Sequence, residues 1–512
     1  MHKIPYNQKP VGYGELIRRL SLNILPHYVT SFVTDGKGRR HTVIDRHIRK
    51  EVYPLPYYPG ESLGDHLTFA LKYEGVNLEI LAAVFQTVSP HEIEAIVRET
   101  PTGKYARQIW FLYEFLTGKE LDLEPVKVAN YIDILDEDQY VTARKEPVPR
   151  QRINNNLLGE RRFCPMVRRT DELKRYQEID FHARTKEVVG RYPKEILQRA
   201  VTYLFTKETK SSFEIERATP DQKRAARFVE LLRHAEEMDF FTKESLIELQ
   251  KAVVDARFAN DDFRKNQNYI GESLGFGREN VHFVTPRPDD LPDLMDGMFV
   301  CHEKMMISGV HPVIAATIVA FGFVFMHPFE DGNGRIHRFL IHNILAKRGF
   351  TPQGMIFPVS ATLVQNMINY DQALELFSKP LLPLIDYDMD ESGQMRVKND
   401  TAIHYRYIDM TAIAERMFGF IEKTVEKELV SELDLLVNYE RAKSTMREVV
   451  DMPDRMIDLF IRICRENGGR ISLNKRKSLF DKLTDEEVAA LEECVSQAFG
   501  LNSNGSSADR NN

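Results

Sequence analysis

The sequence predicts an all-α fold that carries one small β-hairpin. Apolar residues recur at helical spacing along most of the chain, and the segment 311–326 is apolar at nearly every position, which is typical of a helix buried on all sides. Residues 268–285 break this pattern, because Gly275 and Gly277 precede the alternating stretch VHFVT, which predicts a hairpin. A chain of 512 residues with 43% apolar residues can bury large apolar cores and should divide into about three domains.

Residues 1–190 are expected to form a helical N-terminal domain. Ser89, followed by Pro90 and Glu92, is a strong helix start within it. Near its end, residues 144–175 carry ten basic and four acidic residues with three prolines, which indicates a domain junction. These arginines could form a patch for an acidic partner. The aromatic interleaving of a single-strand binder is lacking, so capping of neighbouring helices is the favoured interpretation.

Residues 191–385 are expected to form the functional domain. Helical segments with short loops cover 192–258, and the buried helix 311–326 is followed by a second helix that ends in a cationic turn and Gly349. Residues 386–501 predict a further helical domain for interaction or dimerisation, with Thr484 as one helix start. The polar end, 502–512, is expected to be disordered.

The composition of the chain limits which partners and which cellular compartment are expected. The net charge of −7 does not favour nucleic acid as a partner. The four cysteines lie far apart without a CxxC pair, so neither a disulfide framework nor a thiolate zinc site is predicted. The first ten residues lack the apolar core of a signal peptide, and the longest apolar run is too short to span a bilayer. A cytoplasmic protein without membrane contact is therefore expected.

The stretch MHPFEDGNGRIHRF, residues 326–339, gathers phosphate-binding groups between the two predicted helices. Gly332 and Gly334 flank Asn333 at the start of the second helix, where exposed backbone N–H groups bind phosphate. Arg335 and Arg338 stand three residues apart and can clamp further phosphate oxygens. A phosphate-containing ligand is the expected guest.

Two other side chains of the stretch supply a metal ligand and a base. Asp331 is a hard oxygen ligand of the kind that holds Mg²⁺ together with phosphate oxygens and water. His327 is the side chain that can exchange a proton near neutral pH. Each would be an ordinary structural residue alone, but their combination with a phosphate site predicts nucleotide chemistry.

This stretch resembles the signature HxFx(D/E)GNGRxxR of the Fic (filamentation induced by cAMP) family and matches it at every specified position. The matching residues are His327, Phe329, Asp331, Gly332, Asn333, Gly334, Arg335 and Arg338. The resemblance covers roughly residues 205–385. It implies a helical core that transfers AMP from ATP to a Ser, Thr or Tyr hydroxyl of a target protein and releases pyrophosphate.

The resemblance also implies roles within the stretch. His327 would deprotonate the target hydroxyl, Asp331 would bind Mg²⁺, and the backbone from Gly332 to Gly334, through Asn333, would bind phosphate. Arg335 would steady the phosphates, and Arg338 would reach the γ-phosphate of ATP. Phe329 would anchor the loop in the core.

Features outside the stretch add a docking element and a nucleotide contact to this resemblance. The hairpin at 268–285 lies where the family carries a flap that holds a target segment by strand pairing. Tyr370, in NYDQALELF, is similar in position to a residue beside the adenine, although a single tyrosine could equally belong to the core. Members of the family are often dimers, so a homodimer is implied.

An upstream segment, SSFEIERATP, resembles the inhibitory (S/T)xxxE(G/N) helix of self-inhibited Fic proteins. Ser212 and Glu216 match at positions i and i+4 of a helix, and the resemblance implies that Glu216 pairs with Arg338 and displaces the γ-phosphate. This sequence departs from the pattern at Arg217, where the family has Gly or Asn to end the helix.

These observations predict an autoinhibited protein adenylyltransferase. Removal of AMP and other nucleotidyl or phosphoryl transfers share the same loop in related proteins, so they stay open. A non-catalytic protein that senses nucleotide is the alternative from another class, and the presence of both His327 and Asp331 counts against it.

Overall fold

The computed structural model describes residues 8–35, 39–45, 48–275, 278–352, 354–390 and 393–501. The predicted disordered tail at 502–512 lies outside these residues. The chain divides into two compact units. The first comprises the described residues up to Asp180 with Thr209–Phe350 and Leu363–Phe420, and the second comprises Phe181–Glu208, Thr351–Thr362 and the described residues from Ile421 onward.

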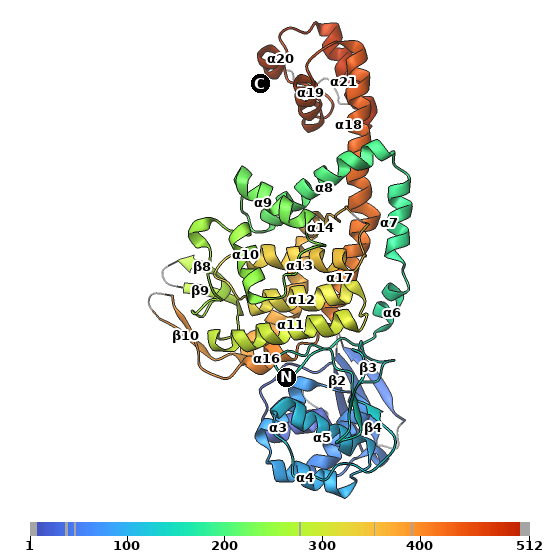
Figure 1. Ribbon diagram of the computed structural model, residues 1–512, viewed down its shortest axis with the longest axis vertical. Helices are drawn as coiled ribbons and strands as arrows, with labels where there is room; N and C mark the ends of the chain where they lie inside the picture. Colours follow the sequence, from blue (N-terminus) through green and yellow to red (C-terminus); the bar gives the residue numbers. More distant parts are fainter. Residues whose placement is uncertain are drawn as a thin grey trace. The chain divides into compact units, whose positions relative to one another are not determined.

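The N-terminal region combines two small sheets with a cluster of helices (Figure 1). The strands are β1 Gln8–Val11, β2 Val29–Thr34, β3 His41–Asp45, β4 Ile48–Pro54, β5 Ile132–Asp133, β6 Glu146–Val148 and β7 Ile153–Asn155. The first sheet has the order β1-β2-β4-β3 and the second β5-β7-β6. The prediction of a helical domain here was wrong in this respect, because β2 alternates buried and half-buried residues with the period of a strand.

The helices of this region bury a shared apolar core. They are α1 Tyr13–Leu20, α2 Leu63–Phe69, α3 Leu78–Thr87, α4 Pro90–Glu99, α5 Lys104–Thr117 and α6 Asp171–Gln177. The predicted start of α4 is confirmed, because Ser89 and Glu92 form a capping box with each other's backbone N–H groups. Trp110 of α5 is fully buried in this core.

The arginines of the basic segment 144–175 bind structural partners. Arg161 donates to the carbonyl of Thr117 at the end of α5, and Arg150 donates to the carbonyl of Leu121. Arg162 pairs with Asp296 at 3.2 Å. These contacts agree with the predicted helix-capping role and leave the interpretation as a patch for an acidic partner without support.

The segment also carries an aromatic wedge. Phe163 is fully buried against two helices that contribute glycines at the contact. A Cβ atom at Gly297 would lie 2.7 Å from the Phe163 backbone nitrogen, and one at Gly322 would lie 3.0 Å from the end of its ring. The neighbouring residue Cys164 donates its backbone N–H to the carbonyl of Arg406. The segment around Phe163 thus packs against parts of the first unit that lie far from it in the sequence.

Three helices at the centre of the first unit position the candidate site. Its helices after residue 220 are α9 Gln222–Arg233, α10 Lys243–Val253, α11 Leu291–Ile307, α12 Pro312–Met326, α13 Asn333–Lys347, α15 Met367–Leu381, α16 Ala402–Arg406 and α17 Thr411–Lys423, which runs on into the second unit. Helix α12 packs against both α11 and α13 (Figure 1). Every residue from Val313 to Met326 is buried, which confirms the predicted central helix.

The predicted hairpin is present as an antiparallel pair of strands. Strand β8, Tyr269–Gly275, pairs with β9, Arg278–Val284, and β9 packs against α15. The tip, 276–277, lies outside the described residues. A second short antiparallel pair, β10 Tyr387–Met389 and β11 Met395–Val397, interrupts the region that was predicted to be purely helical after residue 385.

The second unit is a group of helices. They are α7 Phe181–Gly190, the first part of α8 Lys194–Ile215, the start of α14 Val359–Gln365, α18 Leu429–Val449, α19 Asp454–Glu466, α20 Leu473–Leu479 and α21 Asp485–Phe499. Thr484 and Glu487 form the predicted capping box at the start of α21. Across the part of the chain that the structure describes, we find no helix with the length and apolar character needed to cross a bilayer.

The Phe163 wedge yields a stability prediction. Gly297→Ala should lower the free energy of unfolding of the first unit by about 1–3 kcal/mol, because the added methyl group meets backbone atoms that cannot rotate away. Gly14→Ala is the matched control, since Gly14 lies in α1 with its nearest neighbour at 3.7 Å. Thermal unfolding followed by circular dichroism measures both. Equal melting temperatures for the two variants would contradict the tight packing of the Phe163 segment against Gly297.

Candidate functional site

His327 caps the end of α12 in an unusual backbone conformation. Its φ and ψ angles are 50° and 58°, in the left-handed region, which costs a non-glycine residue about 1–2 kcal/mol. The turn reverses the chain between α12 and α13, and the conformation places the imidazole at the start of the loop. A strained residue at this point needs partners that hold it there.

The imidazole of His327 has a defined tautomer. Its Nδ1 atom lies 3.0 Å from the carbonyl oxygen of Val324, which can only accept, so Nδ1 carries the proton and donates it. The Nε2 atom then presents a lone pair. Burial lowers the pKa of His327 to about 4, and the nearby guanidinium of Arg264 acts in the same direction. The group is a neutral base at physiological pH.

The loop between the two helices is closed by one amide. The Asn333 side chain accepts from the backbone N–H of Phe329 at 3.1 Å and donates to the Phe329 carbonyl at 2.8 Å. Phe329 itself is fully buried, as predicted for an anchor. The predicted phosphate contact of Asn333 is through its backbone and stays a prediction, while its buried side chain shapes the loop.

The N-terminus of α13 has the open backbone that a phosphate site needs. Gly332, the N-cap, has φ 92°, and an added Cβ there would lie 2.7 Å from Val254. Gly334 follows in the first turn. Its neighbour on the open side is the carboxylate of Glu216, whose Oε1 atom would lie 2.0 Å from a Cβ on Gly334. A carboxylate therefore sits where the helix attracts an anion.

Asp331 and Arg335 form an ion pair beside this helix start. The Arg335 Nη2 atom lies 2.6 Å from Asp331 Oδ1, and Nη1 donates to the carbonyl of Val253 at 2.8 Å. Arg335 is buried over the ring of Phe213, whereas Asp331 is half-exposed. The described residues contain no group of three or more His, Cys, Asp or Glu side chains that could hold a metal. A single open carboxylate fits Mg²⁺ that takes its other ligands from phosphate and water.

Arg338 joins the motif helix to the end of α8. Its Nε atom donates to the Ser212 hydroxyl at 2.9 Å, and Nη2 donates to the Ser212 carbonyl at 2.7 Å. Nη2 also lies 2.9 Å from Glu216 Oε1. Arg338 is 1% exposed, so its charge depends on these acceptors. The structure thus brings Ser212, Glu216 and Arg338 together.

Helix α8 ends immediately after Glu216 at a left-handed residue. Arg217 has φ 51°, its N–H bonds to the Glu214 carbonyl, and the N–H of Ala218 bonds to the Phe213 carbonyl. These two bonds form a Schellman motif, whose left-handed position favours Gly or Asn. Arg217 keeps the same helix end at the expense of backbone strain.

Tyr370 lies close to the charges of Arg338 and Glu216. It is 4% exposed at the start of α15 and stacks on His337 with ring centroids 6.1 Å apart. Burial raises the pKa of Tyr370 to about 12. The residue is buried in the core beside the site, and its stacking on adenine stays a prediction.

Two buried residues that the sequence did not single out also hold the loop. Gln250 of α10 donates to the Asp331 carbonyl at 3.2 Å. Arg264 donates to the carbonyls of His327 and Pro328 from its side chain and backbone, each at 2.8 Å. Neither residue lies in a recognisable motif. Both bind backbone carbonyl oxygens, and because every residue has one, such contacts leave no pattern in the sequence.

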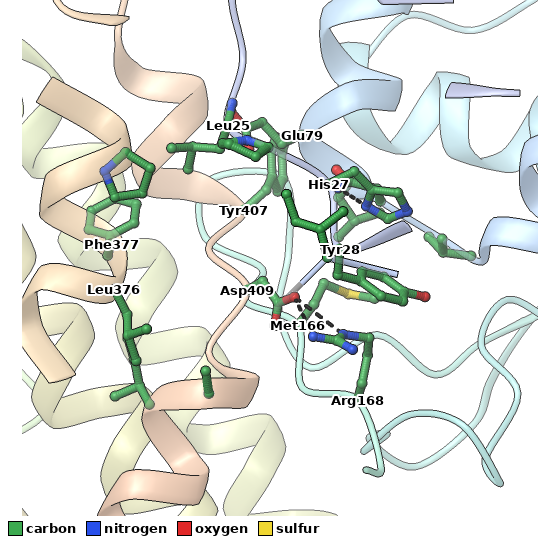
Figure 2. A pocket seen from close by; sticks show the side chains of 18 of the residues that line it. Leu25, His27, Tyr28, Glu79, Met166, Arg168, Leu376, Phe377, Tyr407 and Asp409 are labelled. Carbon is green, nitrogen blue, oxygen red and sulfur yellow. Dashed lines mark hydrogen bonds and ion pairs between the residues drawn. The ribbon is translucent and has the colours of Figure 1, made fainter. Parts of the chain in front are cut away.

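A separate cavity of about 780 Å³ lies in the first unit, beside α15 (Figure 2). Leu376 and Phe377 line one side, and Arg168 and Asp409, paired at 3.3 Å, line the other. Among the described residues, those that line it do not include the residues of the 326–339 stretch. The candidate site is therefore distinct from this cavity.

The buried base yields a prediction about pH. The His327 imidazole should stay neutral, with Nε2 unprotonated, from pH 7 down to about pH 5, and protonate as the pH falls through about 4. The unfolded chain binds this proton near pH 6.5, so His327 lowers the free energy of unfolding as the pH falls from about 6.5 to about 4. ¹⁵N NMR of labelled histidine, assigned with His327→Ala, measures the titration. A titration midpoint near 6.5 would contradict the burial of the His327 imidazole.

The left-handed end of α8 yields a second prediction. Arg217→Gly should raise the free energy of unfolding by about 1 kcal/mol, because glycine adopts the angle without strain. Arg217→Ala is the matched control, since it removes the same side chain but keeps the Cβ atom. Denaturant unfolding should show stabilisation for Arg217→Gly only. Equal stabilisation by both would assign the effect to the lost arginine charge.

The comparisons with known proteins agree with this site. Residues 240–345 match the model of the Fic/DOC family. The chain is 33% identical over 114 residues to a protein adenylyltransferase Fic of Drosophila virilis, and 32% identical over 117 residues to that of Aedes aegypti. Each match covers 22% of this chain and 21% of the relative, so the chain spans about a fifth of the length of the relatives it matches.

A solved structure is also similar to this chain. A Fic family protein from Desulfovibrio desulfuricans G20 is 18% identical, with a TM-score of 0.35, over 65% of this chain and 85% of that protein. The family match, in contrast, contains the whole loop, all of α12, and α13 up to residue 345. The similarity to the Fic/DOC family therefore covers residues 240–345 of this chain.

Proposed function

We propose that this chain is an autoinhibited protein adenylyltransferase, which transfers AMP from ATP to a hydroxyl group of a target protein and releases pyrophosphate. The observation that carries the proposal is the neutral His327, with its Nε2 lone pair open, at the start of a loop that leads into a helix N-terminus. The relatives named above support the choice of adenylyl transfer among the reactions that this loop could serve.

His327 would act as the general base. Its Nε2 atom takes the proton of the target hydroxyl as that oxygen attacks the α-phosphorus of ATP, and the bond from this phosphorus to the bridging oxygen of the β-phosphate breaks. The proton held on Nδ1 by Val324 fixes the ring and leaves Nε2 as the acceptor. General base catalysis of this kind contributes about 10²- to 10⁴-fold.

The start of α13 would hold the phosphates. Backbone N–H groups of the first turn would supply donors to the phosphate oxygens once the Glu216 carboxylate leaves Gly334, and Arg335 would add positive charge behind them. Asp331 is the residue that would bind Mg²⁺, which supplies charge neutralisation on the phosphates when bound. Arg338 would reach the γ-phosphate once its present partners leave.

Glu216 would be the inhibitory group. Its carboxylate pairs with Arg338 and lies against Gly334, so it uses the guanidinium and occupies the space that a γ-phosphate would need. Two anions at this distance would repel each other strongly in a partly buried site. ATP that bound beside Glu216 would therefore be displaced from the orientation required for attack.

The hairpin would dock the target. In the described residues β8 pairs with β9 alone, so the other edge of β8 can accept an extended peptide by strand addition. Ile270 on β8 is 42% exposed and offers an apolar contact beside that edge. A peptide paired there would pass near the loop, because Asn268, directly before β8, donates to the Phe329 carbonyl at 3.5 Å.

Incorporation of ATP labelled at the α-phosphate tests both parts of the proposal. In Mg²⁺ with a cell lysate as the source of targets, Glu216→Gly should increase protein labelling about 10-fold or more over the wild type, because Arg338 and the space beside Gly334 become available. Adding His327→Ala should remove about 99% or more of that label.

Glu214→Gly is the matched control, since Glu214 is an exposed residue one position before the end of the same helix. It should leave labelling at the wild-type level. Labelling that rises equally in Glu214→Gly would assign the effect to helix fraying. Binding of ATP by Glu216→Gly without any labelling would reject adenylyl transfer and favour a different nucleotide reaction or a nucleotide sensor.

A further inference from the structure

Arg264 is a buried cation whose hydrogen bonds all go to backbone carbonyls. It is 3% exposed. Its Nε atom donates to His327 O at 2.8 Å, Nη1 to Asn266 O at 2.8 Å, and Nη2 to Pro286 O at 2.6 Å. A guanidinium removed from water requires such acceptors, and burial lowers the pKa of Arg264 to about 10 without neutralising it at pH 7.

These acceptors belong to two places that the reaction must keep together. His327 and Met326, which accepts from Nη2 at 3.5 Å, supply the last carbonyls of α12, which have no partner within the helix. Asn266 and Pro286 lie just outside the two ends of the β8–β9 hairpin. One rigid planar group therefore joins the end of α12 to both legs of the hairpin.

The bond to His327 acts on a strained residue. The left-handed angle of His327 directs its carbonyl toward Arg264, and the backbone N–H of Arg264 also binds the next carbonyl, that of Pro328. Rotation of the peptide plane after His327 would break the hydrogen bond from Arg264 Nε to the His327 carbonyl and would move the imidazole. Relaxation to a less strained angle is therefore opposed by a charged hydrogen bond.

We propose that Arg264 is the positioning residue that holds the backbone of His327 in its left-handed conformation. It thereby fixes the position of the imidazole relative to the hairpin. The inference rests on the proposed function for its catalytic consequence. A peptide paired with β8 would then present its hydroxyl to a base whose position is fixed relative to the same strands. Lysine could replace the charge, but not the three directions of the guanidinium.

The kinetic test uses Arg264→Lys in the active Glu216→Gly background. The kcat for protein labelling should fall about 10-fold or more, because the base is misplaced, while the KM for ATP stays within about twofold. The matched control is Arg287→Lys, since the half-buried Arg287 flanks the same hairpin but pairs with the carboxylates of Asp290 and Asp400. It should leave kcat within about twofold of its parent.

A structural test does not depend on activity. The ¹⁵N NMR titration of His327 should move from its low midpoint toward about 6.5 in Arg264→Lys, because an imidazole that swings away from Val324 gains water. A folded Arg264→Lys variant with unchanged kcat and an unchanged His327 titration would overturn the proposal. If Glu216→Gly itself shows no labelling, the proposed function fails, and the titration alone decides the role of Arg264.

A third comparison separates positioning from a general need for Arg264 in folding. Glycine at 327 adopts the left-handed angle without strain, so Arg264→Lys should lower the melting temperature less in His327→Gly than in His327→Ala, which keeps the Cβ atom. Equal losses in the two backgrounds, or failure of Arg264→Lys to fold in either, would show that Arg264 supports the fold as a whole and would overturn the proposal.

Discussion

The reversal of the chain between two buried helices is the constraint on which the site depends. Helix α12 is buried throughout its length and α13 nearly so, which means that neither can shift to accommodate the loop. The loop has to fit a fixed gap, and it does so with a left-handed His327, an Asn333 amide that closes it on Phe329, and a glycine N-cap. In the proposed function, this one arrangement both holds the His327 base and exposes the backbone that would bind phosphate.

In the proposed function, the guanidinium of Arg338 takes part in both regulation and catalysis. Arg338 is almost fully buried, so its charge needs an anionic or dipolar partner in every state of the protein. Ser212 and Glu216 provide that partner from α8. In the proposed function a phosphate would compete for the same donors, and the outcome would depend on a difference between two strong interactions. Small changes in the end of α8, including its strained Arg217, would then shift the balance.

The sequence predicted the parts of this site that have periodic or clustered signals. The apolar run before Met326 and the glycines at 332 and 334 were sufficient to place two helices and the loop, and the i, i+4 spacing of Ser212 and Glu216 was sufficient to place both on one helix face. Arg264 could not be found this way, since it binds carbonyls that carry no sequence signature. The N-terminal sheets were missed because the sequence of β2, VTSFVT, does not alternate apolar and polar residues: the polar Ser31 is buried on the same face as Val29 and Val33.

The wedge at Phe163 has a consequence for how this protein can be divided. The Phe163 ring packs on Gly322 and its backbone packs on Gly297, so the two helices that carry these glycines are shaped for a residue located more than 100 positions earlier in the chain. A fragment that began near residue 190 would contain the complete loop and inhibitory helix, yet it would expose an aromatic-sized apolar notch on its surface. Such a fragment would be prone to self-association, and the region before residue 180 is better regarded as part of the core of the first unit than as an attachment to it.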